Sequence, residues 1–247
     1  MSDAAPAPRA SCRCAPLLGS SIGRKWVVAL TGIFLILFVI GHLLGNVTFF
    51  FGPDWINAYA EHLQGLGFFL WIIRLVLLAI VGTHILFTIL LWHENMRAKP
   101  QKYAVSSTLE TTVYARSMRL SGLVVLAFII FHLVHFTWQG LNPETRLWHD
   151  AQGRHDVYRM MVAGFSNAYV SGFYILAVGL LAMHLNHGIA SLFQTLGLTT
   201  AAMRSRYERS ARVLGWVIFA GFASIPLSVL VGYCRYPWTP GCPFCCH

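Results

Sequence analysis

Five long runs of apolar residues alternate with shorter polar segments along the chain. The runs cover residues 26–51, 68–92, 120–138, 168–196 and 213–233. A helix needs roughly 20 apolar residues to cross about 30 Å of hydrocarbon, because it rises about 1.5 Å per residue. The pattern therefore predicts an all-α membrane protein, a bundle of five transmembrane helices whose termini lie on opposite sides of the bilayer.

The composition agrees with this class of protein. Hydrophobic residues make up 56% of the 247 residues and charged residues only 11%, and the mean hydropathy is +0.60. A soluble domain of this length carries more polar surface. The composition therefore excludes a soluble fold.

Lysine and arginine residues gather on one side of the predicted bundle. They crowd the N-terminal segment, the connection between the second and third helices and the connection between the fourth and fifth. The other side holds only Arg146, Arg154, Arg159 and Arg235. By the positive-inside rule the N-terminus is cytoplasmic and the C-terminus lies outside. The net charge of +9 then reflects topology and attraction to acidic membrane lipid, and it gives no reason to expect nucleic acid.

Histidines lie deep in four of the five apolar runs, at two heights. His84 and His184 lie about 12 and 18 Å from the inner ends of their helices, whereas His42 and His132 lie about 24 Å in. A six-coordinate haem takes one axial nitrogen from each side of its ring, so two histidines at one height on different helices suit it. A single membrane histidine can instead bond a neighbouring carbonyl, but two paired layers favour haem.

Several short motifs occur together in this chain. They are residues 20–23 with 29–32, residues 41–46, residues 57–63, residues 131–133, and residues 184–188 with 193–197. In combination they resemble the cytochrome b558 membrane-anchor subunit of succinate dehydrogenase and fumarate reductase, respiratory complex II. The resemblance covers most of the chain, from residue 20 to residue 230.

The resemblance implies a five-helix bundle with two b-type haems. His84 and His184 would be the axial ligands of the haem b nearer the cytoplasm, and His42 and His132 match the outer pair. Electrons would come from a flavoprotein subunit and an iron–sulfur subunit docked on the cytoplasmic side, and would pass to a membrane quinone, expected to be menaquinone. The chain would contribute to enzyme activity only within this complex, in a bacterial plasma membrane that it crosses several times.

The outer layer departs from the family pattern. His135 follows His132 by one helical turn. The tail is apolar and carries cysteines, and the chain from Cys234 to Cys242 can extend up to roughly 26 Å. A Rieske-type [2Fe–2S] centre takes two imidazoles on one iron and two thiolates on the other. We expect such a cluster in place of the outer haem. Its ligands would be two histidines and two cysteines from among His42, His132, His135, Cys242, Cys245 and Cys246.

Alternative roles for these residues remain open. The tail cysteines could form disulfides on an oxidising outer face, and His42 and His132 would then hold a second haem b. Zinc also accepts cysteine and histidine, but it carries no electrons. A protein of another class, a histidine-lined metal or proton transporter, also places imidazoles across a membrane, although deep intramembrane carboxylates would be expected in it.

The sequence signal for a quinone site is weaker. Such a site needs an apolar slot and hydrogen-bond donors, and the segment after the first helix offers Tyr59, Glu61 and His62 near the outer layer. The same residues could simply cap the neighbouring helices. Arg74, a basic residue inside a span, either pairs with a haem propionate or reaches toward the outer interface.

The chain divides into three parts on these grounds. Residues 1–19 are expected to form a flexible cytoplasmic leader, and residues 20–233 a five-helix transmembrane redox domain. Residues 234–247 are expected to form a cysteine-rich tail that folds back on the outer face.

Overall fold

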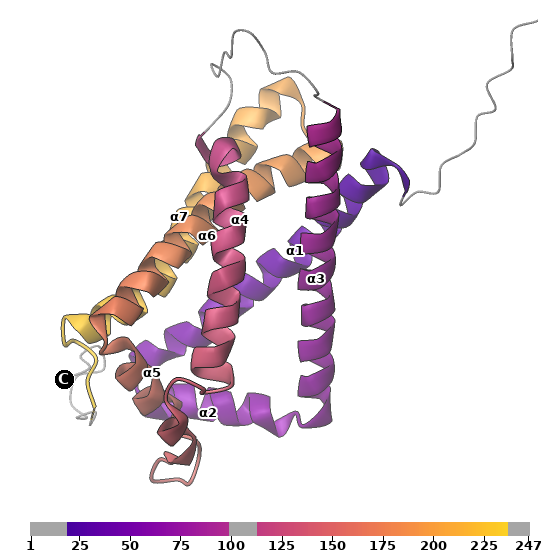
Figure 1. The fold of residues 1–247 in the computed structure, drawn as a ribbon. Helices are drawn as coiled ribbons and strands as arrows, with labels where there is room; N and C mark the ends of the chain where they lie inside the picture. Colours follow the sequence, from indigo (N-terminus) through magenta and orange to yellow (C-terminus); the bar gives the residue numbers. More distant parts are fainter. Residues whose placement is uncertain (1–18, 99–112, 237–247) are drawn as a thin grey trace, which may run out of the picture.

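The computed structural model describes residues 19–98 and 113–236. Over these residues the fold is helical, apart from one isolated β-bridge between His149 and His155. The five long helices are α1 (Ser21–Val47), α3 (Phe68–Arg97), α4 (Val113–His132), α6 (Ala168–Thr195) and α7 (Ala201–Leu230) (Figure 1). The shorter ones are η2 (Thr48–Phe51), α2 (Pro53–Gly65), η3 (Leu133–Thr137), η4 (Pro143–Leu147) and α5 (Val157–Phe165).

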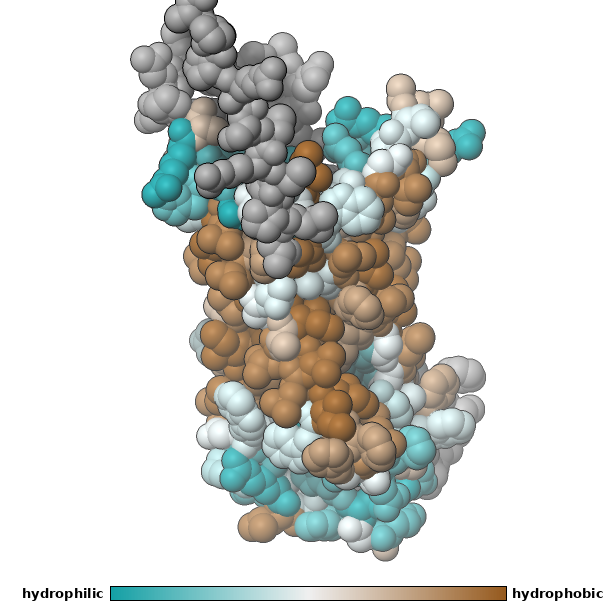
Figure 2. Space-filling view, turned by 90° about the vertical axis from the view of Figure 1, so that its right-hand side faces the viewer, coloured by the Kyte–Doolittle hydropathy of each residue, from teal (hydrophilic) through white to brown (hydrophobic). Residues whose placement is uncertain are grey.

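Five helical segments are long and apolar enough to cross a membrane, which confirms the predicted fold class. They are Ser21–Phe51, Phe68–Arg97, Ser117–Thr137, Ala168–Thr195 and Ala201–Leu230. Figure 2 shows a broad hydrophobic surface around the middle of the molecule, with hydrophilic residues gathered toward both ends. Such a belt matches the hydrocarbon region of a bilayer. The side on which each terminus lies stays a prediction.

Local sequence signals explain where these helices begin and turn. The side chain of Ser20 caps α1 by accepting a hydrogen bond from the Gly23 amide at 3.0 Å. Asn167 caps α6 in the same way, through the amides of Tyr169 and Val170. Gly67 has a φ of +52° between α2 and α3, a conformation that favours glycine.

Three features differ from the sequence prediction. Helix α7 begins at Ala201, twelve residues before the predicted start at residue 213, because its arginine-rich first turns are helical although they are not apolar. Helices α2 and α5 also occupy segments that the hydropathy pattern left without structure. They are short and amphipathic, so they give no continuous apolar run.

Two pairs of helices form the framework of the bundle. Helix α3 packs on α1, and α4 packs on α6, while α7 lies along α6 and also contacts α1 (Figure 1). At one end of the bundle the Arg24 guanidinium forms an ion pair with the Glu94 carboxylate, which ties the start of α1 to the end of α3. The pairs α1/α3 and α4/α6 are called the two half-bundles below.

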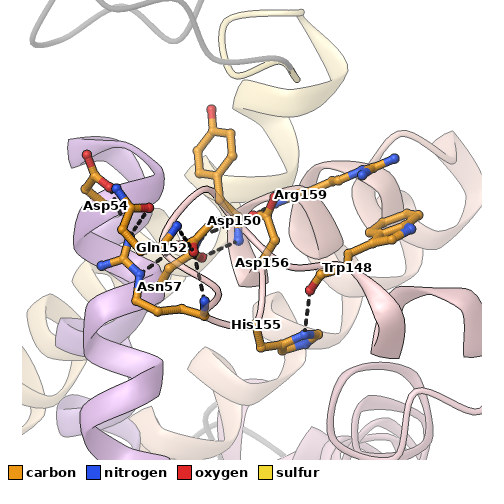
Figure 3. Close-up of polar contacts among 10 residues, drawn as sticks. Asp54, Asn57, Trp148, Asp150, Gln152, His155, Asp156 and Arg159 are labelled. Carbon is orange, nitrogen blue, oxygen red and sulfur yellow. Dashed lines mark hydrogen bonds and ion pairs between the residues drawn. The ribbon is translucent and has the colours of Figure 1, made fainter.

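The other end of the bundle is closed by a cap made of α2, α5 and the connection between α4 and α5. Asn57 of α2 is fully buried there. Its amide nitrogen donates to Asp150 at 3.2 Å and to Asp156 at 3.3 Å, and its amide oxygen accepts from the Tyr158 backbone amide at 3.0 Å. Figure 3 shows these side chains converging from α2 and from the connection. A fully paired buried network of this kind fixes the position of α2 on α5.

Arg154 adds charge to the cap. It donates to Asp150 through Nε at 2.7 Å and to Asp54 through a terminal nitrogen at 2.9 Å, so it joins the connection to α2. Burial alone would raise the pKa of the Asp150 carboxyl, but the hydrogen bonds from Arg154 and Asn57 outweigh burial and hold that pKa below its ordinary value. Asp150 is therefore ionised at neutral pH.

The close approach of α6 and α7 predicts a strong effect of one methyl group. A Cβ at Gly215 would lie 2.9 Å from Asn186 Oδ1 and 3.0 Å from the Ala182 carbonyl oxygen, so Gly215→Ala must push the helices apart. We expect a loss of about 1–3 kcal/mol in stability, measured as a lower thermal midpoint in detergent. Gly172→Ala on α6 is the matched control, because its Cβ meets nothing within 4 Å. Equal midpoints for the two variants would contradict this account of the packing.

The cap is expected to weaken in acid through Asp150. Because its folded-state pKa is depressed, its stabilising contribution is present at neutral pH and is lost as the pH falls through that folded-state pKa. The thermal midpoint of the wild type should exceed that of Asp150→Asn near neutral pH, and the gap should close as the pH falls below about 4. Asp54→Asn is the control, since its carboxylate is 71% exposed and should matter less. A gap between wild type and Asp150→Asn that stays constant over this range would be evidence against the assignment.

Candidate functional site

The histidine of α3 is held against α1 by a threonine and a glycine. His84 Nδ1 lies 3.0 Å from the Thr31 hydroxyl oxygen. A Cβ at Gly32 would lie 3.7 Å from His84 Cε1, so the imidazole rests close to the α1 backbone at this point. Thr31 in turn donates its hydroxyl proton to the Val27 carbonyl at 2.7 Å.

The histidine of α6 has a matching environment on α4. His184 Nδ1 lies 3.4 Å from the Ser121 hydroxyl oxygen, and Ser121 donates to the Met118 carbonyl at 3.1 Å. A Cβ at Gly122 would lie 3.4 Å from His184 Cε1. Each half-bundle therefore presents one histidine whose ring contacts a hydroxyl residue and the glycine that follows it.

We assign the proton of each ring from these contacts. A hydroxyl has one proton, and both Thr31 and Ser121 give theirs to a helix carbonyl, so each can only accept from the facing histidine. His84 and His184 then carry hydrogen on Nδ1 and a free lone pair on Nε2. An imidazole oriented through one nitrogen in this way is ready to bind a metal through the other.

A second pair of histidines meets nearer the cap. The rings of His42 on α1 and His132 on α4 have their centroids 5.8 Å apart and are nearly perpendicular, at 83°. Phe38 stacks on His42 at 5.4 Å, and Phe222 of α7 lies 5.8 Å from it. The edge-to-face contact therefore brings one imidazole of α1 and one of α4 together at this position.

His135 lies beside His132 and contacts the same tyrosine. Residues Leu133–Thr137 form a π-helical turn, which breaks the ordinary α-helical spacing after His132. His135 Nδ1 lies 3.0 Å from the Tyr174 hydroxyl, and a Cβ at Gly164 would lie 3.0 Å from its Nε2. Both ring nitrogens of His135 are thus engaged or covered by protein, while His132 lies across from His42.

The Tyr174 hydroxyl links these two neighbours. It lies 3.4 Å from His132 Nδ1 as well as 3.0 Å from His135 Nδ1, and the tyrosine is only 5% exposed. Phe128 and Phe165 pack edge-on against its ring, at 5.1 and 5.0 Å. Tyr174 therefore holds the orientation of both imidazoles.

The same spacing of glycine and histidine recurs on both half-bundles. On α1, Gly32 precedes His42 by ten residues, and on α4, Gly122 precedes His132 by ten. Ten residues correspond to about 15 Å along a helix. His84 and His184 therefore contact α1 and α4 ten residues before the positions of His42 and His132 on those helices. That each pair forms one layer stays a prediction.

Two of the three residues predicted to contact a quinone line one hollow. The hollow has a volume of about 470 Å³ and is lined by Thr48, Asp54, Trp55, Ala58, Tyr59 and His62. Tyr59 packs so closely on α1 that a Cβ at Gly45 would collide with its ring, and Gly45 lies one helical turn from His42. Glu61 is exposed and does not line the hollow.

The remaining predicted residues take no part in these clusters. Arg74 is exposed on α3, and its guanidinium lies 5.1 Å from the centre of the Trp71 ring. Cys242, Cys245 and Cys246 lie outside the described residues. Within residues 19–98 and 113–236, no group of three or more His, Cys, Asp or Glu side chains is arranged to hold a metal ion.

Three contributors were missed from the sequence: Thr31, Ser121 and Tyr174. A hydroxyl residue in an apolar helix ordinarily bonds its own backbone, so neither Thr31 nor Ser121 stands out. The available signal was the repeated arrangement of a hydroxyl residue, a glycine, and a histidine ten residues after the glycine.

Comparison with known proteins adds no further constraint. Neither a protein-family model, nor a curated protein, nor a solved structure matches the chain.

Proposed function

We propose that the chain is the membrane anchor and electron-transfer subunit of a succinate dehydrogenase or fumarate reductase, the quinone oxidoreductase of respiratory complex II. The observation that carries this proposal is the contact between histidines of opposite half-bundles. The ring centroids of His42 and His132 are 5.8 Å apart, and His84 and His184 lie against Gly32 and Gly122, ten residues earlier on the same two helices. Two redox centres stacked across a membrane suit transfer of electrons between a docked subunit and a quinone.

The residues of the first layer, His84 and His184, fit a haem b. Each of its histidines has Nδ1 committed to a hydroxyl oxygen, which leaves Nε2 as an axial donor. The backbone at Gly32 and Gly122 allows close approach where the imidazoles lie. A haem iron held by protein ligands exchanges one electron at a potential set by those ligands and their surroundings. His84 and His184 would hold it, and Thr31 and Ser121 would keep their rings oriented.

The second layer supplies two imidazoles, and the tail would decide which centre they hold. With two thiolates from among Cys242, Cys245 and Cys246, His42 and His132 would complete a Rieske-type [2Fe–2S] cluster, which we favour. Without the thiolates they would hold a second haem b. Of the three candidate histidines, we propose His42 and His132 as ligands and His135, whose Nδ1 lies 3.0 Å from the Tyr174 hydroxyl, as a supporting residue.

The length of the tail is compatible with the cluster. Phe222, which contacts His42, is followed by eight more residues of α7, or about 12 Å of helix. Helix α7 then ends at the cap, where the Tyr158 hydroxyl donates to the Arg235 carbonyl at 3.3 Å. Cys242 follows Tyr236 by six residues, an extended length of about 20 Å. The cysteines can therefore reach back from the cap to the second layer.

The hollow beside Tyr59 and His62 is the proposed quinone site. It lies within one helical turn of His42 along α1, and its wall combines the Trp55 ring with a phenol and an imidazole that can donate hydrogen bonds. A quinone needs such donors at its carbonyl oxygens and an apolar surface along its ring. Menaquinone is the quinone that we propose here.

The basic end of the bundle, where Arg24 and Glu94 pair, is the proposed cytoplasmic end. The flavoprotein and iron–sulfur subunits would dock there. This orientation places the cap and the second layer on the outer side of a bacterial plasma membrane.

Spectra of the purified complex test this proposal. We expect the optical band of a reduced b-type haem, and the rhombic electron paramagnetic resonance signal of a reduced Rieske-type cluster. His84→Ala should remove the haem band, and His132→Ala should remove the cluster signal. His135→Ala should keep the cluster signal, although it changes its shape, because His135 acts through Tyr174. A second haem band lost in His132→Ala would instead establish two haems, and a complex without either signal would refute the electron-transfer role.

The hydroxyl contact of His84 gives a sharper test of the first layer. Thr31→Val keeps the shape of the side chain but removes the oxygen that accepts from Nδ1, so the affinity for haem should fall roughly 10- to 100-fold. Titration of haem into the haem-free chain, followed by absorbance, measures this affinity. Thr88→Val is the matched control, because the Thr88 hydroxyl bonds the backbone carbonyl of His84 at 2.7 Å and leaves the ring alone. Equal affinities for the two variants would refute the orienting role of Thr31.

A further inference from the structure

Helix α7 carries a shallow groove on its outward face. The groove has a volume of about 640 Å³ and is lined by Arg209, Arg212, Val213, Trp216, Val217 and Ala220. The opposite face of α7 is buried, with Ala211 and Ile218 each 1% exposed. Since α7 is one of the helices that can cross a membrane, the groove faces the surrounding lipid.

The lining of the groove is divided by chemistry along the helix. The two arginines lie at one end and three residues apart, so they share a face. Val213 and Val217 are more than half exposed beyond them. From Arg209 to Ala220 the helix rises about 16 Å, which is close to half of the roughly 30 Å hydrocarbon thickness of a bilayer. The groove therefore has the length of an acyl chain in one leaflet, with positive charge at its surface end.

Neighbouring acidic groups do not neutralise this charge. The Glu208 carboxylate accepts from Arg204 at 3.0 Å, while Arg212 reaches only the Glu208 backbone carbonyl, at 3.4 Å. The ion pairs among residues 19–98 and 113–236 include neither Arg209 nor Arg212. Two guanidinium groups on one face can bind a phosphate with several charge-assisted hydrogen bonds.

Trp216 completes the wall of the groove. Its ring packs edge-on against Phe219 at 5.5 Å and remains 50% exposed. It lies about 10 Å along the helix from Arg209, a depth at which an acyl chain, and not a headgroup, would touch it.

We propose that this groove binds one acidic phospholipid, with its phosphate between Arg209 and Arg212 and an acyl chain along Val213, Trp216 and Ala220. A zwitterionic lipid brings a cationic headgroup near two arginines, which is unfavourable. A soluble anion would leave the apolar part of the groove unfilled. The proposal depends only on α7 crossing a membrane, so it stands or fails separately from the proposed electron transfer.

Quenching of Trp216 fluorescence tests the proposal. The full chain is placed in phosphatidylcholine nanodiscs that contain a small fraction of lipid with brominated acyl chains, either phosphatidylglycerol or phosphatidylcholine. The difference between wild type and Trp216→Phe isolates the signal of this tryptophan. Two arginines at the membrane surface predict a preference of about 30-fold for the brominated acidic lipid. Raising the salt concentration should reduce that preference in the wild type.

Substitutions at the two arginines complete the experiment. Arg209→Gln with Arg212→Gln should bring quenching by the acidic lipid down to the level of the zwitterionic one. Arg204→Gln is the control, because its guanidinium pairs with Glu208 and should leave the preference intact. Equal quenching by both lipids in the wild type would overturn the proposal. An unchanged preference for the acidic lipid in the double variant would also overturn it. Absence of Trp216 quenching by either lipid would overturn it too, because a protein surface would then cover the groove. If the double variant does not fold, the salt dependence of the wild type decides the question.

Discussion

The structure depends on how a helix bundle accommodates imidazoles at membrane depth. An uncompensated polar group in hydrocarbon costs several kcal/mol by order of magnitude, so each ring nitrogen needs a partner. Thr31 and Ser121 satisfy Nδ1 of His84 and His184, and they do so with oxygens whose protons are already committed to helix carbonyls. These contacts satisfy one nitrogen of each ring, and the opposite nitrogen, Nε2, is the one that a bound ligand would pair with.

Buried polar groups are also paired in the cap at the end of the bundle. Asn57 joins α2 to the connection through carboxylates and a backbone amide, without leaving its own amide unpaired. Because α2 is fixed in this way, Tyr59 is pressed against α1 at Gly45, one turn from His42. The buried polar network of the cap thus helps to set the shape of the hollow near His42. A cap that loosened would change the hollow before it changed the helices that carry the histidines.

The sequence predicted the spans well because they depend on a simple regularity. Hydropathy identifies a helix that crosses a bilayer, and a constant rise per residue converts position into depth. The π turn at Leu133–Thr137 could not be predicted, because no composition signal marks it. The contact of His135 with Tyr174 follows only from the pairing of α4 with α6. Helices α2 and α5 were missed because burial of one face by tertiary contacts, and not local hydrophobicity, stabilises them. The roles of Thr31 and Ser121 follow only from helix pairing, since each contacts a histidine at least 53 residues away in sequence.

The ten-residue spacing between glycine and histidine on α1 and α4 means that both helices contribute to both histidine layers. Each of these helices supplies the hydroxyl and glycine that support a histidine of the first layer, and each carries a histidine of the second layer ten residues later. A shift of α1 relative to α4 would therefore alter both histidine pairs together, because α1 and α4 contribute to each of them. Helix α6 resists such a shift, since it packs on α1, α4 and α7 at once. The close contact of α6 with α7 at Gly215 is thus part of the geometry of the histidine layers, although Gly215 touches none of their rings.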